Sequence, residues 1–269
     1  PVGASLQDIE DIRRSLGLDR PILAQYFNYI GGFFRLDLGN SIVQNISVAE
    51  IIAARMPYTV ALALAALAIA IGIGVPLGFL TAIWQDRAAG RMITALVLAA
   101  QSIPTFWSSI LLVLVFAVWL GWLPASGASG PASIVLPAVA LGFFSMATFA
   151  RITRSAVVEE LSREYVRTAH SKGLSTARIL IRHVSRNASI SIIAITALEM
   201  ANLLTGAIIV ETVFAWPGLG QATIQALSAR DFPVVQGIVL LGAVVAIALN
   251  LIADILYGTV DPRIRQARR

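Results

Sequence analysis

Long runs of apolar residues, separated by short polar segments, dominate the chain from residue 58 onward. A helix needs about 20 apolar residues to cross the hydrocarbon core of a bilayer. The segments that approach or exceed this length are Tyr58 to Trp84, Met92 to Leu120, Ile134 to Ala150, Ile190 to Val210, and Gly237 to Tyr257. The third of these segments is the shortest. The pattern predicts an all-α polytopic membrane protein with five transmembrane helices.

Residues 1–56 are mixed in composition and contain no run of membrane length. Their first part carries apolar residues at helical spacing, namely Leu6, Ile9, Ile12 and Leu16. This spacing predicts an amphipathic helix that ends before Pro21, because a proline disfavours helix at the preceding residue. The next segment, ILAQYFNYIGGFFRL, is aromatic and amphipathic, which is typical of a helix lying at a membrane surface.

The distribution of Lys and Arg predicts the orientation, because positively charged loops stay on the cytoplasmic side. The segments 85–91, 151–187 and 259–269 are rich in arginine, whereas 121–133 has no positive charge and 211–236 has only Arg230. We therefore expect the long loop and the C-terminal tail to be cytoplasmic and residues 1–56 to be extracytoplasmic. Five spans alone do not deliver residues 1–56 across the membrane, so we expect a sixth span before Pro1. The expected regions are 1–56, a membrane domain over 57–258 with the loop 151–187, and a tail over 259–269.

Composition narrows the function. Hydrophobic residues make up 57% and charged residues 13% of the chain, about half the charged share of soluble domains. The net charge of +5 lies in loops beside apolar spans, so it does not indicate a nucleic-acid partner. The chain has no cysteine, and it lacks phosphate-loop, nucleophile-elbow, HExxH and dinucleotide-binding motifs. We therefore expect a protein that is not an enzyme and holds no metal or cofactor of its own.

The longest polar block after residue 57 lies between the third and fourth apolar segments, from Glu159 to Ser189. The turn Ser171-Lys172-Gly173 divides it into two short helical patterns, and Gly173 is expected to adopt a positive φ. Ser175 is a candidate cap for the second helix. That helix carries a stripe of arginines at every fourth position, namely Arg178, Arg182 and Arg186. A basic face that anchors to lipid explains the arginines, whereas a docking surface for a partner also explains the first helix and the turn.

Glycine and proline interrupt several apolar segments. They are Gly72, Gly74, Pro76, Gly78, Pro104, Pro137 and Gly142. Small residues let helices approach closely in lipid, so tight packing is the favoured interpretation. Bending beside a transport pathway is the alternative, because a proline frees a carbonyl that neighbours or water must satisfy.

Glu199 lies in the middle of the fourth span, with Asn202 three residues later. A carboxylate at this depth costs several kcal/mol, so it is expected to face the bundle interior or a water-filled cavity. Glu199 and Asn202 are therefore candidate pathway residues, and a buried hydrogen bond between helices is the alternative for Glu199. The outer loop from Glu211 to Gly237 has an aromatic, Pro-Gly centre. An aromatic anchor at the membrane interface is its favoured interpretation, and a cap over the pathway mouth is the alternative.

Several of these segments together resemble a known family. They are LGLDRPILAQYFNYIGGFFRLDLGNSI, EYVRTAHSKGLSTARILIRHVSRNA, VETVFAWPGLGQ and DPRIR. In this order they resemble the permease subunit of bacterial ABC importers of the oligopeptide/dipeptide family, over essentially the whole chain. The second segment resembles that family's EAA loop. Ala169 and Gly173 match its second Ala and its Gly, while Arg167 and Thr168 stand in place of its Glu and first Ala. Ser191 stands where many members have a proline.

The resemblance implies the partners, the location and the site. It implies a bacterial inner-membrane subunit that works with a second similar permease, two cytoplasmic ATPases holding ATP and Mg, and an extracytoplasmic solute-binding protein. The surface that contacts an ATPase would be Arg167, Thr168, Ala169, Lys172, Gly173 and Leu174. The implied substrate is a peptide, with nickel, glutathione, opines or oligosaccharides as alternatives within the family.

Two other classes of membrane protein fit the residues less well. An ATP-independent channel or secondary transporter would carry ionisable residues on several spans, and only Glu199 is central here. A membrane-embedded enzyme would show paired carboxylates, histidine clusters or Ser/Lys pairs at membrane depth, and none is apparent in the sequence.

Overall fold

The computed structural model describes residues 10, 13, 19–35 and 37–260. These residues form helices and no β-strand beyond one isolated bridge between Asn40 and Ser47. The expected helix over Leu6 to Leu16 and the arginines of the C-terminal tail lie outside the described residues. The prediction of an all-α protein is confirmed for the part of the chain that is described.

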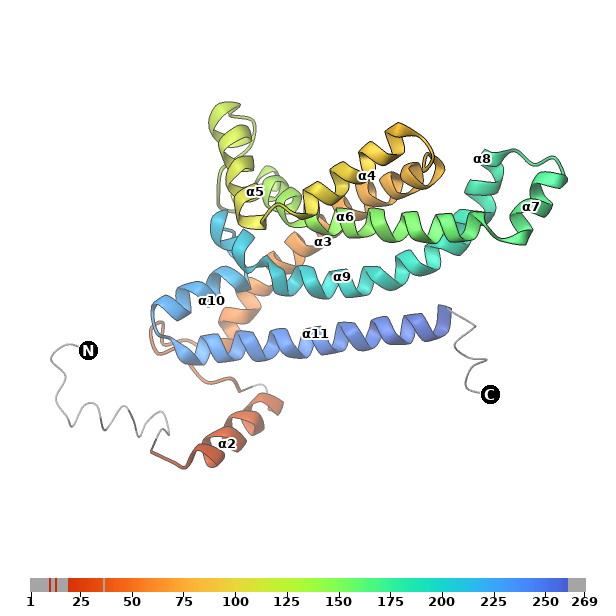
Figure 1. Cartoon of the computed structure of the whole chain (residues 1–269). Helices are drawn as coiled ribbons and strands as arrows, with labels where there is room; N and C mark the ends of the chain where they lie inside the picture. Colours follow the sequence, from red (N-terminus) through yellow and green to blue (C-terminus); the bar gives the residue numbers. More distant parts are fainter. Residues whose placement is uncertain (1–9, 11–12, 14–18, 36, 261–269) are drawn as a thin grey trace, which may run out of the picture.

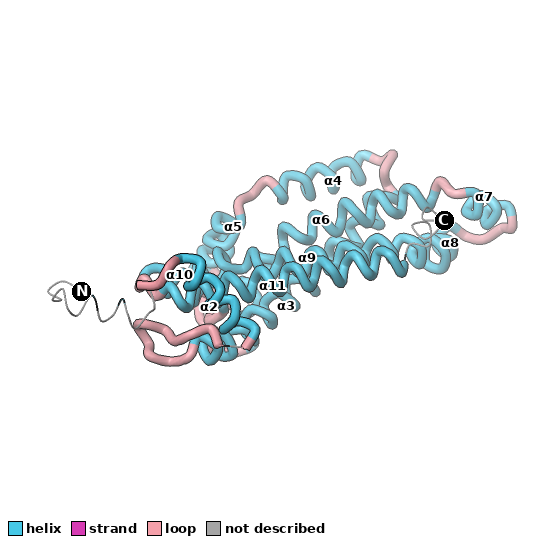
Figure 2. Tube along the Cα trace, turned by 90° about the horizontal axis from the view of Figure 1, so that it is seen from below, coloured by secondary structure: helices cyan, strands magenta, loops and turns pink. Residues whose placement is uncertain are grey.

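Long helices lie side by side in an elongated bundle (Figures 1 and 2). They are α3 (Val48–Ile83), α6 (Val135–Leu161), α9 (Ser185–Val213) and α11 (Phe232–Val260). Within the described ranges, four helices are long and apolar enough to cross a membrane, and a bent pair makes a fifth candidate span. The polytopic membrane fold is therefore confirmed, with five spans when the bent pair counts as one.

The first span, α3, is longer than its apolar run. It begins at Val48 rather than at Tyr58, because Ser47 caps it by accepting a hydrogen bond from the Ala49 amide. Its 36 residues extend about 54 Å, whereas the hydrocarbon core of a bilayer is about 30 Å thick. The expected boundary between residues 56 and 57 therefore falls inside one continuous helix.

The second predicted span, Met92 to Leu120, is not one straight helix. It is split into α4 (Ala88–Gln101) and α5 (Thr105–Leu112), and the latter continues into the π-helical segment η1 (Val113–Trp119). The two halves meet at an angle of 99°. Pro104 lies at the break, where its missing N–H and its ring exclude a continuous helix.

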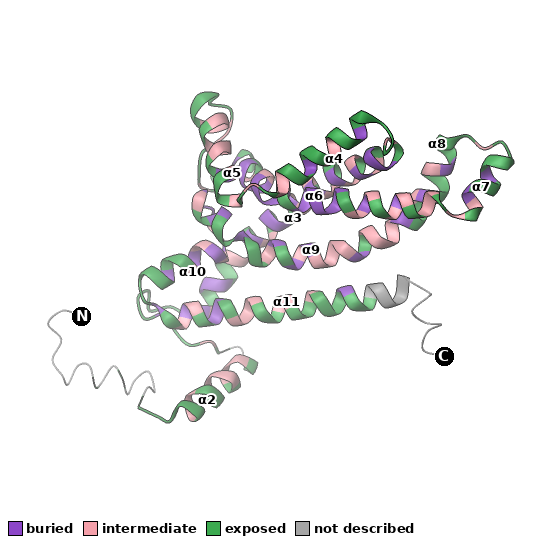
Figure 3. Cartoon of the chain, in the orientation of Figure 1, coloured by how far each residue is buried: buried purple, intermediate pink, exposed green. Residues whose placement is uncertain are grey.

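The third predicted span is the most enclosed of the long helices in the described bundle. The short helix η2 (Pro131–Ile134) precedes α6. The apolar run ends at Ala150, but the polar residues that follow it remain helical as far as Leu161. In its apolar window 67% of residues are buried, against 11% in α11 (Figure 3). Pro137 lies in the first turn of α6, where its missing N–H breaks no helical hydrogen bond.

Close approach between α3 and α6 holds the bundle together. A Cβ at Gly74 would meet the Met146 carbonyl and the Phe149 side chain, and a Cβ at Gly78 would meet Thr153. On α6, a Cβ at Gly142 would meet the Ala66 carbonyl. The tight-packing interpretation is confirmed at these three glycines. Pro76 lies inside the continuous α3 and does not break it.

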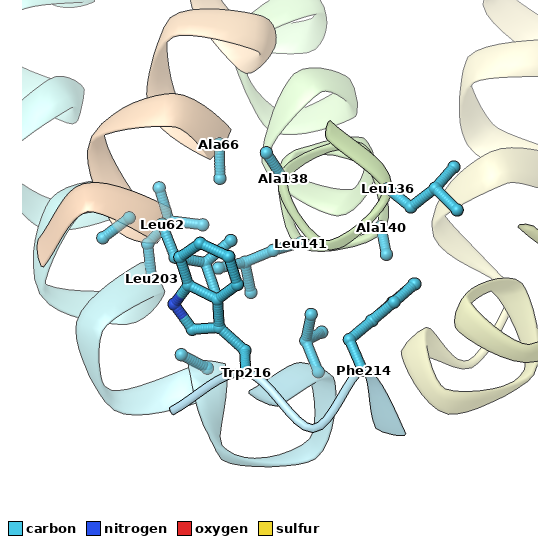
Figure 4. Packing of buried hydrophobic residues seen from close by; sticks show 12 residues of the cluster. Leu62, Ala66, Leu136, Ala138, Ala140, Leu141, Leu203, Phe214 and Trp216 are labelled. Atoms are coloured by element: carbon cyan, nitrogen blue, oxygen red, sulfur yellow. The ribbon is translucent and has the colours of Figure 1, made fainter. Parts of the chain in front are cut away.

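A cluster of buried apolar side chains joins α3, α6 and α9 (Figure 4). Leu62 of α3, Leu141 of α6 and Leu203 of α9 meet there with Phe214 and Trp216, which follow α9. This cluster places the Phe214–Trp216 segment inside the bundle.

Two short helices lie at the end of the bundle opposite to the basic loop. The first, α2 (Ile22–Phe34), lies away from the long helices and has no buried residue, as expected for an amphipathic surface helix (Figures 1 and 3). The second, α10 (Leu219–Ser228), packs between α9 and the start of α11.

The glycine contact predicts a difference between two neighbouring positions of α3. Gly74→Ala is expected to destabilise the protein by about 1–3 kcal/mol, because the added methyl group overpacks the contact with α6. Gly72 has open space around it, so Gly72→Ala should be neutral or stabilising by up to about 1 kcal/mol. Thermal unfolding of the purified variants in detergent measures both effects. Equal melting temperatures for the two variants would contradict the packing described here.

Candidate functional site

The basic loop forms a small helical unit at one end of the bundle. It consists of α7 (Glu164–Ser171), a turn, α8 (Thr176–Ile179) and the π-helical segment η3 (Leu180–Val184), which runs into α9 (Figure 1). The predicted pair of short helices with a turn at residues 171–173 is confirmed. The turn between α3 and α4, which carries Arg87, lies toward the same end (Figure 1).

Gly173 has the geometry that the sequence predicted. Its φ is +77°, a backbone angle that residues with a Cβ adopt only at a cost in free energy. Its amide donates to the His170 carbonyl at 2.9 Å, and the Leu174 amide donates to the Ala169 carbonyl at 3.2 Å. This pair of bonds is the Schellman motif, which ends a helix with a left-handed glycine. No described atom lies within 4 Å of a Cβ built at Gly173, so the turn has an open face.

The unit has its own apolar core. Val166 and Ala169 of α7 pack with Ile179 of α8 and with Val157 of α6. Among the candidate coupling residues, Arg167, Thr168, Lys172 and Gly173 are exposed and Leu174 is half-buried, but Ala169 is buried. Ala169 therefore lies beneath the exposed face, and its small side chain lets α7 approach the helices below.

A polar cluster that the sequence analysis missed ties this unit to both neighbouring spans. The Glu160 carboxylate of α6 accepts hydrogen bonds from the Tyr165 hydroxyl at 2.7 Å and from Asn187 Nδ2 of α9 at 3.0 Å. Arg163 bridges Glu159 at 2.6 Å and lies 3.7 Å from Glu160. Burial and the bond to Glu160 raise the pKa of Tyr165, so its hydroxyl keeps its proton and remains a donor. We call these side chains the loop clamp.

The second half of the loop differs from the prediction in one detail. Ser175 precedes α8 as its N-cap residue, but its side chain makes no capping hydrogen bond within the described structure. The arginine stripe, by contrast, is exposed as expected, at Arg178, Arg182 and Arg186. The start of α8 is therefore set by the preceding glycine turn and by the burial of Ile179.

Glu199 and Asn202 do not share an environment. Glu199 is buried between α9 and α6, where it accepts a hydrogen bond from the Ser145 hydroxyl at 2.6 Å. Asn202 is exposed on the same helix. The bond to Ser145 is a buried hydrogen bond between two helices, which is the alternative to a pathway role for Glu199. The sequence contained no sign of this partner, because it lies 54 residues away.

The loop after α9, which we expect to be extracytoplasmic, is fixed by a buried carboxylate. Glu211 accepts hydrogen bonds from the Thr59 hydroxyl at 2.7 Å and from the Gly220 and Gln221 amides at 2.7 and 3.1 Å. These amides belong to the first turn of α10, so Glu211 satisfies the free N–H groups at that helix start. A Cβ at Gly218 would collide with the same carboxylate, which explains the first glycine of the PGLG segment.

The aromatic residues of this loop are buried, so their interpretation as an anchor at the membrane interface is wrong. Phe214 and Trp216 are 1% and 5% exposed, and Trp216 Nε1 donates to the Tyr58 carbonyl of α3 at 2.9 Å. Their rings fill the space between α3, α6 and α9 instead of facing lipid (Figure 4). We call the contacts of Thr59, Glu211 and Trp216 the outer latch.

A second buried carboxylate joins the outer segments. Asp231, at the turn between α10 and α11, accepts hydrogen bonds from the Ser41 hydroxyl and, at 3.1 Å, from the Ile42 amide. It thereby ties the segment before α3 to the start of α11. Within the described ranges, no three His, Cys, Asp or Glu side chains come together as a metal site would require.

Comparisons with known proteins agree with this arrangement. The family described as "Binding-protein-dependent transport system inner membrane component" matches residues 74–266, which is well over half of the chain. A Brucella abortus (strain 2308) protein named as a peptide transport system permease is 40% identical over 98% of this chain and 86% of its own length. The glutathione transport system permease protein GsiC of Escherichia coli (strain K12) is 38% identical over 97% of this chain and 86% of its own.

Solved structures show the same fold. The inward-facing MetNI methionine ABC transporter has a chain that superposes with a TM-score of 0.68 at 18% identity, covering 78% of this chain and 96% of that one. An amino acid ABC transporter crystallised with histidines gives a TM-score of 0.59 at 17% identity, over 78% of this chain and 94% of that one.

The family match, the near full-length relatives and the membrane fold lead to one conclusion. The protein is a multi-pass permease subunit of an ABC importer, a transport component rather than an enzyme, and it belongs to the family of inner-membrane components of binding-protein-dependent transport systems.

Proposed function

We propose that this permease subunit imports peptides by ATP-driven alternating access and that the loop around Gly173 is its contact with an ATPase. The observation that carries the proposal is the basic loop, whose exposed turn rests on its own apolar core at the end of two spans. The names of its relatives support the substrate class, since they refer to peptides and to glutathione, which is itself a tripeptide. No observation favours nickel, opines or oligosaccharides.

The loop clamp and the apolar core connect the loop to the membrane spans, so a movement of the loop is transmitted to these spans. A partner that presses on α7 acts on α6 through Glu160 and Arg163, and on α9 through Asn187. Because α6 is the most enclosed span and α9 ends at the outer latch, the same two helices connect both ends of the bundle. The exposed contact surface comprises Arg167, Thr168, Lys172 and Gly173 with part of Leu174, whereas Ala169 supports it from beneath.

The remaining parts of the importer follow from this role. A second, similar permease completes the pathway, two cytoplasmic ATPases hold ATP and Mg, and a solute-binding protein delivers the peptide from outside. The chain itself needs no cofactor. Its membrane is the bacterial inner membrane, with the basic loop and the C-terminus in the cytoplasm. The gathering of basic turns at one end of the bundle supports this orientation.

Substitutions at Gly173 test the coupling surface. Gly173→Val should strain the turn by about 1–2 kcal/mol, because φ is positive, and should reduce both ATPase co-purification and transport. Gly173→Asn should retain the turn, because Asn tolerates positive φ, but should still weaken docking through its added side chain. Gly127→Val is the matched control, since Gly127 has a φ of +83° and open space around it, and its amide donates to the Phe214 carbonyl at the other end of the bundle.

The measurements are ATPase recovery and labelled-dipeptide uptake by the reconstituted complex, with unlabelled glutathione as competitor. Wild-type ATPase recovery and coupling in both Gly173 variants would contradict the docking role of the loop. Uptake of glutathione without uptake of peptides would contradict the broader substrate while leaving the docking result intact.

Glu199 and Asn202 can be tested as a pair. If Glu199 has only a structural role through Ser145, then Glu199→Gln and Ser145→Ala should each lower the free energy of unfolding by about 1–3 kcal/mol. Both variants should therefore show a lower melting temperature. Transport per assembled complex should stay at the wild-type rate in both. Asn202→Ala serves as the exposed comparison and should leave the melting temperature unchanged. A changed substrate preference in Glu199→Gln, at unchanged stability, would instead place Glu199 in the pathway.

Orientation is testable because the chain has no native cysteine. Ser129 and Ser175 are exposed, and they lie in the segment between η1 and η2 and in the turn between α7 and α8, respectively. These two segments are at opposite ends of the bundle (Figure 1). In intact cells, Ser129→Cys should react with a membrane-impermeant maleimide, whereas Ser175→Cys should react only after permeabilisation. The reverse pattern would overturn the proposed orientation.

A further inference from the structure

A small cleft lies between α3, α4 and α6, within the half of the bundle that carries the basic loop. Its volume is about 40 Å³. Thr81 of α3, Thr94 and Leu98 of α4, and Arg151 and Arg154 of α6 line it. It is separate from the exposed turn of the basic loop, from the outer latch and from Glu199.

Neither of these two arginines is paired with an acidic side chain among the residues that the structure describes. Within the described residues, the ion pairs to acidic side chains are formed by Arg163, and neither Arg151 nor Arg154 takes part in one. Arg154 Nε is buried and makes no hydrogen bond in the described structure. A buried guanidinium N–H without an acceptor is rare and costly, so its presence at a cleft indicates an acceptor supplied from outside the chain.

The chemistry of the lining selects an anion. The Thr81 hydroxyl donates to the Leu77 and Gly78 carbonyls, and the Thr94 hydroxyl donates to the Gly90 carbonyl. These hydroxyls have therefore already used their protons, and the donors left to the cleft are the guanidinium N–H groups. Two neighbouring guanidinium groups match the geometry and charge of a phosphate.

The surroundings of the cleft indicate where that phosphate comes from. The arginines lie one and four residues after Ala150, where the apolar run of α6 ends, which is the depth expected for a lipid headgroup. On α4, beside the cleft, the apolar side chains of Met92, Leu96 and Leu98 are half or more exposed. A free phosphate ion makes no favourable contact with this apolar surface, whereas the acyl chains of a lipid would cover it.

We propose that this cleft binds the phosphate of one anionic phospholipid, held by Arg151 and Arg154, with its acyl chains along α4. Basic pockets between spans on the cytoplasmic side are a known mode of lipid headgroup binding. The bound lipid supplies an acceptor for Arg154 Nε, which has none within the described structure, and covers the exposed apolar side chains of α4. This site is independent of which solute the importer carries.

The test measures lipid retention by the intact complex, purified in detergent with its partner subunits. Native mass spectrometry counts bound lipids after addition of phosphatidylglycerol or phosphatidylcholine. Wild-type protein should retain phosphatidylglycerol in preference to phosphatidylcholine. The double variant Arg151→Gln/Arg154→Gln should lower that retention at least about tenfold, since each charge-assisted hydrogen bond contributes enough for such a factor. The control Arg178→Gln/Arg182→Gln removes the same charge from the exposed stripe and should retain the lipid.

A second variant covers the case in which the double variant fails to assemble. Thr94→Leu keeps both arginines but fills the cleft, and it should also lose the lipid. Millimolar inorganic phosphate should not displace the lipid from the wild-type complex. Equal lipid loss in both arginine pairs, full retention in Thr94→Leu, or displacement by phosphate alone would overturn the proposal. Loss of the ATPases from Arg151→Gln/Arg154→Gln with lipid retained would likewise overturn it and assign the arginines to a protein contact.

Discussion

The structure depends first on the close contact between α3 and α6. Inside a bilayer the lipid is as apolar as the side chains, so helices gain little from hiding apolar surface and associate through close packing instead. Gly74 and Gly78 of α3, with Gly142 of α6, bring the two backbones together where any Cβ would collide. The most enclosed span is thereby placed at the centre, and α9 packs against the same pair. The basic loop and the outer latch are both attached to these three helices.

The two ends are secured by the same device, a carboxylate that collects hydrogen bonds from separate segments. At the end with the basic loop, Glu160 joins α6 to α7 and α9. At the other end, Glu211 joins α9 to α3 and to the first turn of α10, while Asp231 joins the segment before α3 to α11. A carboxylate with such donors is satisfied where it lies, so each loop has a defined position relative to its spans. A loop with a fixed position can transmit a movement to its span, whereas a flexible loop would deform instead.

Among the described residues, the arginines on and beside the basic loop differ in their surroundings. Arg163 is paired with glutamates, and the stripe through Arg178 is exposed to solvent. Arg154, by contrast, has a buried Nε that makes no hydrogen bond within the described part of the chain. The positive charge of the loops supports the proposed orientation, whereas the role proposed for each arginine depends on the surroundings of its guanidinium group. The lipid proposal rests on this last distinction.

The sequence by itself determined the features that depend on local chemistry. Apolar length located the spans, and the turn Ser171-Lys172-Gly173 predicted the paired helices and the positive φ of Gly173, because each depends on neighbouring residues. Tertiary structure decided the rest. It sets which prolines break a helix, since Pro104 bends its span whereas Pro76 remains inside α3. It also sets the burial of Trp216 and the partner of Glu199, because the atoms they contact lie 158 and 54 residues away along the chain and become neighbours only when the helices pack.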